Sequence, residues 1–195
     1  MTSLPPGPFA TILADPPWSF LTYGKKRTTP HRGADDHYST MTAEDLRALD
    51  VGGVAMKDAA LLMWVVDSHL DEAIELGRAW GFEFKTVAFV WLKCTEASRQ
   101  MTFSGRDVTY RIGMGYWTRK QAELCLLFTR GKPRRVGKGV RQVIEAPRRQ
   151  HSRKPDETYQ RVEALLGGPY LELFARQAQP GWSAWGNQTS KFIAT

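Results

Sequence analysis

The sequence predicts an α/β fold in which a mainly parallel sheet is flanked by helices. Short apolar, β-branched segments alternate with segments of helical periodicity along the 195 residues. Strands that alternate with helices of about 10 to 15 residues are typical of parallel sheets with helices on both faces. The run Ala60 to Val66 is apolar without interruption, which is the pattern of a strand buried on both sides.

Six segments have strand character: Phe9 to Ala14, Ala60 to Val66, Phe84 to Leu92, Glu123 to Phe128, Gln142 to Ala146 and Tyr170 to Phe174. The first ends at Asp15-Pro16-Pro17, because proline lacks the N–H that a strand needs.

Two segments have helical character. The first is predicted to begin near Ser68 and Asp71, which have capping-box-like spacing, and to end at Gly81. The second is predicted to begin at Pro155, with acids in its first turn, and to end before Gly167. Its residues Tyr159, Val162 and Leu166 share one face.

The composition is that of a globular protein, with 42% hydrophobic and 24% charged residues, which argues against disorder. Cys94 and Cys125 lack CxxC spacing, so they fit a reducing compartment and indicate no metal site. No stretch approaches ~18 apolar residues and the N-terminus has no secretory pattern. We therefore expect residues 1–195 to form one cytoplasmic domain that binds neither membrane nor metal.

The net charge of +7 is concentrated in one part of the sequence. Residues 130–154 contain ten basic residues and one acid, Glu145, whereas the rest of the chain has a net charge of −2. Such a segment indicates contact with a polyanion, although a solvated flexible loop would have the same composition.

Parallel sheets bind ligands at the carboxyl ends of their strands. The segments that follow the predicted strands are therefore the expected binding loops, namely 15–38, 93–118, 130–154 and 175–188. The first of them begins Asp15-Pro16-Pro17-Trp18. The Asp15 carboxylate and the Pro16 carbonyl can act as paired hydrogen-bond acceptors beside an aromatic ring, which suits a planar group bearing an NH₂. A proline-rich turn capped by Asp15 and packed by Trp18 is the structural alternative.

ADPPW at 14–18 resembles the catalytic motif of the S-adenosylmethionine-dependent adenine-N6 methyltransferases, the family that includes the catalytic subunit of the eukaryotic messenger-RNA adenine methyltransferase. Further segments resemble this family in the same order: HYSTMTAEDL at 37–46, LLMWVVDSHLDEAIELGRAWGFEF at 61–84, VWLK at 90–93, GYWTRKQAELCLLFTRGKPRR at 115–135, HSRKPDETY at 151–159 and LELFARQAQPGWSAWGNQ at 171–188. The resemblance implies a Rossmann-like methyltransferase fold in which the catalytic motif precedes the cofactor-binding motif.

The resemblance also implies residue roles. Asp15, Pro16, Pro17 and Trp18 would form the catalytic motif, and Asp15 would also lie at the cofactor. Cofactor contacts are implied for Lys154, Glu172, Phe174, Arg176, Asn187 and Gln188. Packing for Trp18, membership of the basic run for Lys154 and an ion pair between Glu172 and Arg176 are the structural alternatives. The segment that helps enclose the cofactor adenine in longer relatives has no counterpart before residue 9.

The implied activity is methyl transfer from S-adenosylmethionine to the N6 amino group of adenine in nucleic acid, with DNA favoured over RNA. Tyr38 resembles an aromatic residue beside the target base. The basic residues expected to bind the substrate are Lys25, Lys26, Arg27, Arg134, Arg135, Arg148, Arg149 and Arg153. RNA adenine-N6 methylation, cytosine-N4 methylation of DNA and a non-catalytic nucleic-acid-binding scaffold are the alternatives. A homodimer or a partner subunit is also compatible with the sequence.

Overall fold

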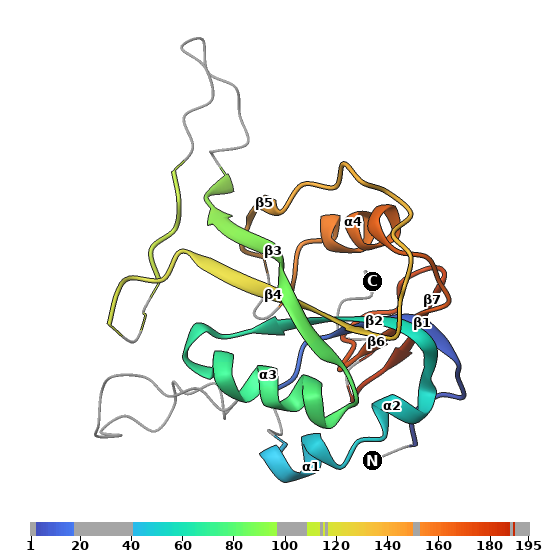
Figure 1. The fold of residues 1–195 in the computed structure, drawn as a ribbon. Helices are drawn as coiled ribbons and strands as arrows, with labels where there is room; N and C mark the ends of the chain where they lie inside the picture. Colours follow the sequence, from blue (N-terminus) through green and yellow to red (C-terminus); the bar gives the residue numbers. More distant parts are fainter. Residues whose placement is uncertain are drawn as a thin grey trace.

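The computed structural model describes residues 3–17, 41–96, 109–113, 115, 117–149, 153–187 and 189. The predicted site residues Trp18, Lys25, Lys26, Arg27, Tyr38 and Gln188 lie outside this part of the chain. Seven strands form one curled sheet in the order β5-β3-β4-β2-β1-β6-β7 (Figure 1). Their bounds are Phe9–Ala14 (β1), Ala55–Val65 (β2), Glu83–Cys94 (β3), Ala122–Arg130 (β4), Val143–Pro147 (β5), Tyr170–Leu173 (β6) and Trp182–Trp185 (β7).

The sheet is mainly parallel, as predicted, and β4 is the strand that departs from this pattern. Strand β4 is antiparallel to both neighbours, β2 and β3, whereas β1, β2, β6 and β7 pair in parallel, as do β3 and β5. We call the edge where the six parallel strands end the carboxyl edge and the opposite one the amino edge. Because β4 is reversed, its first residues lie at the carboxyl edge and its last residue, Arg130, lies at the amino edge opposite Ala59 of β2.

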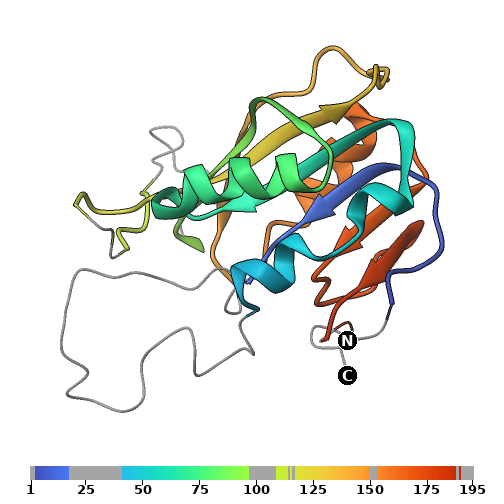
Figure 2. The ribbon, with the colours of Figure 1, turned by 60° about the horizontal axis from the view of Figure 1, so that its bottom comes forward.

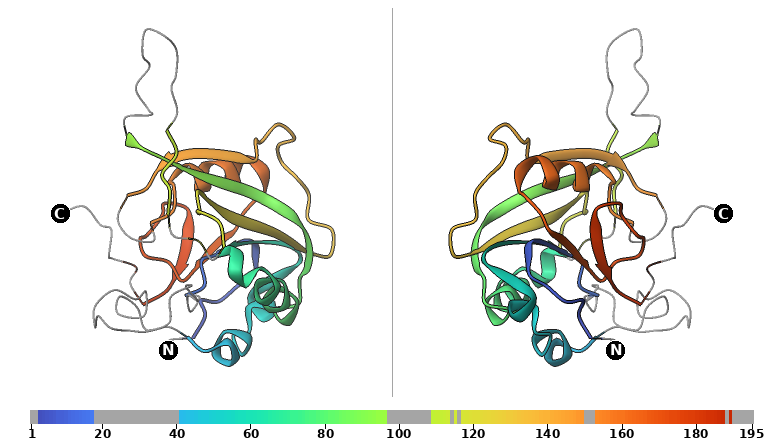
Figure 3. Two further views of the ribbon diagram at one scale, coloured as in Figure 1. Left: turned by 90° about the vertical axis from the view of Figure 1, so that its left-hand side faces the viewer. Right: turned by 90° about the vertical axis from the view of Figure 1, so that its right-hand side faces the viewer.

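Helices cover both faces of the sheet, which confirms the predicted α/β architecture (Figure 3). One face carries α1 (Ala43–Arg47), α2 (Val51–Val54), a 3₁₀ turn (Asp67–His69) and α3 (Leu70–Ala79); the other carries α4 (Glu157–Leu165). The first face has an apolar core that includes Ala73, Leu76 and Trp80 of the α3 region. In the second core Tyr159, Val162 and Leu166 are buried, as their spacing predicts.

The ends of the helices agree with the sequence in part. Gly81 ends the α3 region at a φ of +84°, a conformation that glycine adopts without strain. The predicted cap at Ser68 is wrong, because α3 has no side-chain cap and the Ser68 hydroxyl lies 2.9 Å from Nδ1 of His69. A capping box is found at α1 instead, between Thr42 and Asp45.

Strand β7 and the short helices α1 and α2 were not predicted. Trp182 and Trp185 of β7 are buried while the two residues between them are half-buried, so burial does not alternate along this strand. In the part of the chain that the structure describes, no helix is both long and apolar enough to cross a bilayer.

Candidate active site

Two strands from opposite ends of the chain bring Asp15 and Glu172 to the carboxyl edge. Strands β1 and β6 pair in parallel, with Leu13 opposite Glu172, and the Asp15 N–H donates to the Leu173 carbonyl at 3.5 Å. Pro16 and Pro17 then lead the chain out of the sheet. The motif that follows the first strand therefore lies beside the predicted cofactor strand near the C-terminus.

A small pocket opens to solvent at this edge of the sheet, which is the edge where α/β sheets bind ligands. It brings together six of the predicted site residues: Asp15, Arg153, Lys154, Glu172, Phe174 and Arg176. Asn187 follows β7 and does not line this pocket.

Lys154 contacts two other residues of the pocket lining, Asp15 and Trp64. Its Nζ donates to both oxygens of the Asp15 carboxylate at 2.7 Å each and lies 5.6 Å from the centre of the Trp64 ring. Burial acts to lower the pKa of Lys154, but the charges of Asp15 and Glu123 outweigh burial and raise this pKa. The ammonium therefore stays charged and orients the Asp15 carboxylate.

Glu123 and Lys93 extend this charge network, and the sequence analysis assigned no role to either. Glu123 Oε1 lies 2.5 Å from Lys93 Nζ, and Oε2 lies 3.6 Å from Lys154 Nζ. Burial acts to raise the pKa of Glu123, but the attraction of Lys154 and Lys93 outweighs it and lowers this pKa to about 2. A glutamate inside an apolar strand was the available signal, because a buried carboxylate needs partners. The reversed direction of β4 is what places it at the carboxyl edge.

Glu172 has a different environment. The Tyr159 hydroxyl donates to the Glu172 carboxylate, 3.0 Å from each oxygen. Burial raises the pKa of Glu172 to about 7, and the nearby Asp15 charge adds to the rise, while the Tyr159 hydrogen bond and Lys154 reduce it. The alternative ion pair with Arg176 is not among the ion pairs of the described residues.

Two further features of the pocket are consistent with a bound ligand. Phe174, directly after β6, has a φ of +62°, a backbone conformation that costs a non-glycine residue about 1–3 kcal/mol and is common at functional sites. The Thr158 hydroxyl is buried in the pocket lining and has no hydrogen-bond partner among the described residues, although buried hydroxyls are normally satisfied.

The arrangement can hold a molecule with both positive and negative groups. Asp15 and Glu172 offer carboxylate acceptors for an ammonium or for N–H groups. Lys154 offers a cation three residues before α4, which begins at Glu157 and not at Pro155 as predicted. Thr158 offers a further hydrogen bond.

The structure divides the basic segment 130–154 between the two edges of the sheet. Arg135 bridges to Leu166 beyond the end of α4, at the amino edge, and the neighbouring Arg134 lies there too. Figure 2 shows the gold segment after β4 at the end of the sheet away from the arrowheads of β1 and β2. The expectation that segment 130–154 is a binding loop at the carboxyl ends of the strands is therefore wrong for the part with Arg134 and Arg135, because β4 is antiparallel.

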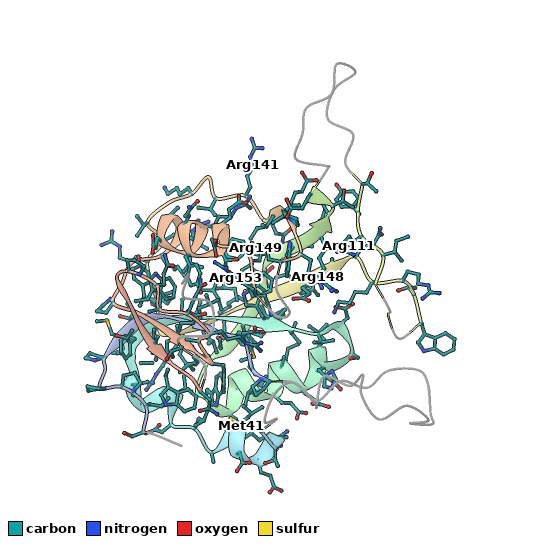
Figure 4. All side chains as sticks on the ribbon, turned by 180° about the vertical axis from the view of Figure 1, so that it is seen from behind. Met41, Arg111, Arg141, Arg148, Arg149 and Arg153 are labelled. Carbon is teal, nitrogen blue, oxygen red and sulfur yellow. The ribbon has the colours of Figure 1, made fainter. Side chains whose placement is uncertain are left out.

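The basic residues after β5 do lie at the carboxyl edge, and two of them are held by an internal acid. Arg149 donates to Asp156 at 2.7 Å and to the Lys154 carbonyl at 3.1 Å, and Arg153 lies 3.5 Å from Asp156. The hydrogen bond to Asp156 raises the pKa of Arg149. Figure 4 shows Arg148, Arg149 and Arg153 in one region, with Arg148 exposed.

Known proteins resemble this chain over nearly its full length. The MT-A70 family profile matches residues 9–188. The type II methyltransferase M.MunI of Mycoplasma sp is 33% identical over 199 residues, which cover 94% of this chain and 78% of that protein. The N(6)-adenosine-methyltransferase catalytic subunit METTL3 of Homo sapiens is 33% identical over 189 residues, 93% of this chain and 28% of that protein. The MT-A70-like N(6)-adenosine-methyltransferase of Drosophila melanogaster is 33% identical over 193 residues, 93% of this chain and 27% of that protein.

The chain thus spans most of M.MunI but less than a third of the two N(6)-adenosine-methyltransferases. These relatives all carry the name of a methyltransferase, so the predicted class of enzyme is confirmed. With a sheet that delivers the Asp-Pro-Pro motif and Glu172 to one pocket, and with 33% identity over nearly the whole sequence, the chain belongs to the MT-A70 family.

Proposed function

We propose that the chain transfers a methyl group from S-adenosylmethionine to the N6 amino group of adenine in nucleic acid, with DNA favoured over RNA. Residues 1–195 act in this proposal as one methyltransferase domain. The observation that carries it is the Asp15 carboxylate, placed directly after β1 in a pocket that also contains Lys154 and Glu172. The relatives support it, because several are named as N(6)-adenosine-methyltransferases.

The pocket fits the proposed methyl donor. S-adenosylmethionine carries an ammonium and a carboxylate at its methionine end and ribose hydroxyls in its adenosyl part, and the sulfonium between these two parts supplies an electrophilic methyl group. Glu172 would hold the ammonium and Lys154 the carboxylate. The unsatisfied Thr158 hydroxyl supports the fit, because a bound polar molecule would supply its missing hydrogen bond. Arg176, with Asn187 and Gln188, would contact the ribose.

Asp15 and Pro16 would position the amine that is methylated. Adenine N6 is a poor nucleophile because its lone pair is delocalised into the ring. The Asp15 carboxylate and the Pro16 carbonyl would accept hydrogen bonds from its two N–H groups and favour a pyramidal nitrogen. As the N6–CH₃ bond forms, the S–CH₃ bond breaks, the sulfur keeps the electron pair, and N6 releases a proton. Positioning and preorganised electrostatics would provide most of the acceleration.

Lys154 and the two prolines keep these acceptors in place. Lys154 is bonded to both Asp15 oxygens, so the carboxylate has one orientation. Pro16 and Pro17 restrict the backbone that carries the second acceptor. We place Trp18 and Tyr38 beside the target base. Phosphate contacts at the carboxyl edge are assigned to Arg148, and further phosphate contacts are proposed for Lys25, Lys26 and Arg27.

The test is methyl transfer by Asp15→Asn and Asp15→Ala variants. The protein is incubated with S-adenosylmethionine labelled in the methyl group and with matched DNA and RNA oligonucleotides, single- and double-stranded, and the nucleosides are analysed. We expect N6-methyladenine with the unaltered protein, mainly in DNA, and a loss of about 10²-fold or more in both variants, because an oriented charged acceptor is removed. Asp71→Asn, an exposed position on α3, is the matched control.

Other products would contradict the proposal in distinct ways. N4-methylcytosine without N6-methyladenine would assign the chain to cytosine methylation. Methyl transfer mainly to RNA would overturn the preference for DNA. Nucleic-acid binding without transfer by the unaltered protein would identify a non-catalytic scaffold.

A further inference from the structure

Four exposed cations lie at the amino edge, on the side of the sheet away from the pocket. We call residues 131–138 the amino-edge loop; its cations are Lys132, Arg134, Arg135 and Lys138, and it contains no acid. Within the described part of the chain, none of the four forms an ion pair. Arg149, Arg153 and Lys154 at the carboxyl edge, by contrast, are all paired with internal acids.

The amino-edge loop is fixed to the body of the protein by its backbone. The Val136 N–H donates to the Leu165 carbonyl at 2.8 Å, and the Lys132 N–H donates to Asp58 at 2.7 Å. Gly131, with a φ of +61°, makes the turn out of β4. These bonds hold the backbone that carries the four cations in one position. The Asp58 carboxylate accepts its hydrogen bond from the backbone of the loop and not from a cationic side chain.

Two further exposed cations flank β5, one at each edge of the sheet. Arg141 and Arg148 are exposed before and after β5, and Figure 4 shows Arg141 pointing outward, apart from Arg148. Helix α4 beside them contributes two acids, but each has a partner. Glu157 is bonded to Arg161 at 2.6 Å, and Glu163 accepts from the Trp182 indole at 2.7 Å.

We propose that the amino-edge loop binds the phosphate backbone of the substrate nucleic acid at a distance from the methylated base. Cations gathered without ion-pair partners repel one another, and a polyphosphate relieves this repulsion and releases its own counterions. The proposal rests on the proposed function only in taking a nucleic acid as the substrate.

The strand register gives the minimum distance between Asp15 and the amino-edge loop. Arg130 is opposite Ala59, and Ala14 is opposite Met63, so about five strand residues separate the two edges at the level of Asp15. At ~3.3 Å per residue this is ~17 Å, or about five base pairs at ~3.4 Å each. A duplex with only three base pairs on either side of the target is too short to reach the loop.

The experiment measures the binding of duplex DNA by fluorescence anisotropy as a function of salt, without methyl donor. The triple variant Arg134→Gln/Arg135→Gln/Lys138→Gln is compared with Arg47→Gln/Arg78→Gln/Lys85→Gln, which removes three exposed charges outside the loop, on α1, α3 and β3. Each protein is tested with a 25-base-pair duplex and with a hairpin that has three pairs on either side of the adenine. Arg134→Lys/Arg135→Lys keeps the charge and tests whether charge alone is needed.

We expect the loop triple variant to bind the long duplex at least about tenfold more weakly at 0.1 M salt. The slope of log K against log salt should become shallower by about 2 to 3, since each phosphate contact contributes about 0.9. The short hairpin should bind equally to all variants, and the lysine variant should bind the long duplex normally. Equal losses in the two triple variants, or losses with the short hairpin, would overturn the proposal.

Failure of this inference can be told apart from failure of the proposed function. If the loop variants bind like the unaltered protein while methyl transfer proceeds, only the role of the loop is wrong. If the loop is needed for binding but no methyl group is transferred, the methyltransferase proposal fails and the role of the loop stands.

Discussion

Replacing Glu172 by Gln should change how the stability of the protein depends on pH. Glu172 is half-buried and accepts a hydrogen bond from Tyr159, and desolvation together with the nearby Asp15 charge raises its pKa from 4.5 to about 7. Between these values the folded state binds a proton that the unfolded state has released. The free energy of unfolding therefore falls as pH rises through this window. The Glu172→Gln variant has an uncharged amide at this position at every pH, so it lacks this fall.

The magnitude follows from the pKa. One pKa unit corresponds to about 1.4 kcal/mol, so a rise from 4.5 to about 7 corresponds to about 3 kcal/mol. The stabilising effect of protonated Glu172 is fully present below pH 4.5 and is lost above pH 7. The unaltered protein should therefore lose about 3 kcal/mol relative to Glu172→Gln between pH 4.5 and pH 8.

Urea unfolding at half-unit steps from pH 4.5 to 8.5 measures this difference. Other titrating groups are common to both proteins and cancel when the two curves are subtracted. Glu75→Gln, at an exposed position on α3, is the matched control and should run parallel to the unaltered protein. If the difference in the free energy of unfolding between the unaltered protein and Glu172→Gln does not change with pH, the raised pKa assigned to Glu172 is refuted.

Binding of the methyl donor provides a second measurement on the same residue. If Glu172 holds the donor's ammonium, it must be ionised, so donor affinity should rise from pH 5.5 to 7.5 by up to about tenfold per unit below pH 7. Calorimetry with S-adenosylmethionine should show this rise in the unaltered protein but not in Glu172→Gln. An equal rise in both proteins would assign the pH dependence to another group.

Two further predictions concern packing and charge. Glu123→Gln leaves Lys93 and Lys154 without their shared anion, so urea unfolding should show a loss of about 3–5 kcal/mol, partly recovered when Lys93→Gln is added; a loss below about 1 kcal/mol would contradict this role. Gly77→Ala should lower the melting temperature despite the better helix propensity of alanine, because a Cβ there would lie 2.3 Å from Phe128 Cε1. We expect a net cost of about 1–3 kcal/mol, relieved by Phe128→Leu; an unchanged melting temperature would show that the ring moves aside at little cost.

Most of the fold could be predicted from local patterns. The strand over 9–14 follows from a short apolar, β-branched run, and the core of the strand over 60–66 follows from an uninterrupted apolar run. The buried face of α4 follows from the spacing of Tyr159, Val162 and Leu166. These patterns predict structure well because a buried position requires an apolar side chain, and the spacing of apolar side chains can be read directly from the sequence. Strand β7 and the caps of α1 and α3 were missed or misplaced, since a short strand and a local cap depend on what packs against them.

The site was predicted in part. Asp15 and Glu172 were expected at one site because the family resemblance implies it and because each lies in or directly after a strand, and both line one pocket in the structure. The distribution of charge around that pocket, by contrast, follows from the way the strands pair, which the sequence pattern does not show. The direction of β4 depends on the pairing of whole strands, and apolar periodicity is the same whichever way a strand runs. That direction brings Glu123 to the pocket and carries Arg134 and Arg135 to the far edge, so the sequence located the positive charge but not the surface that presents it.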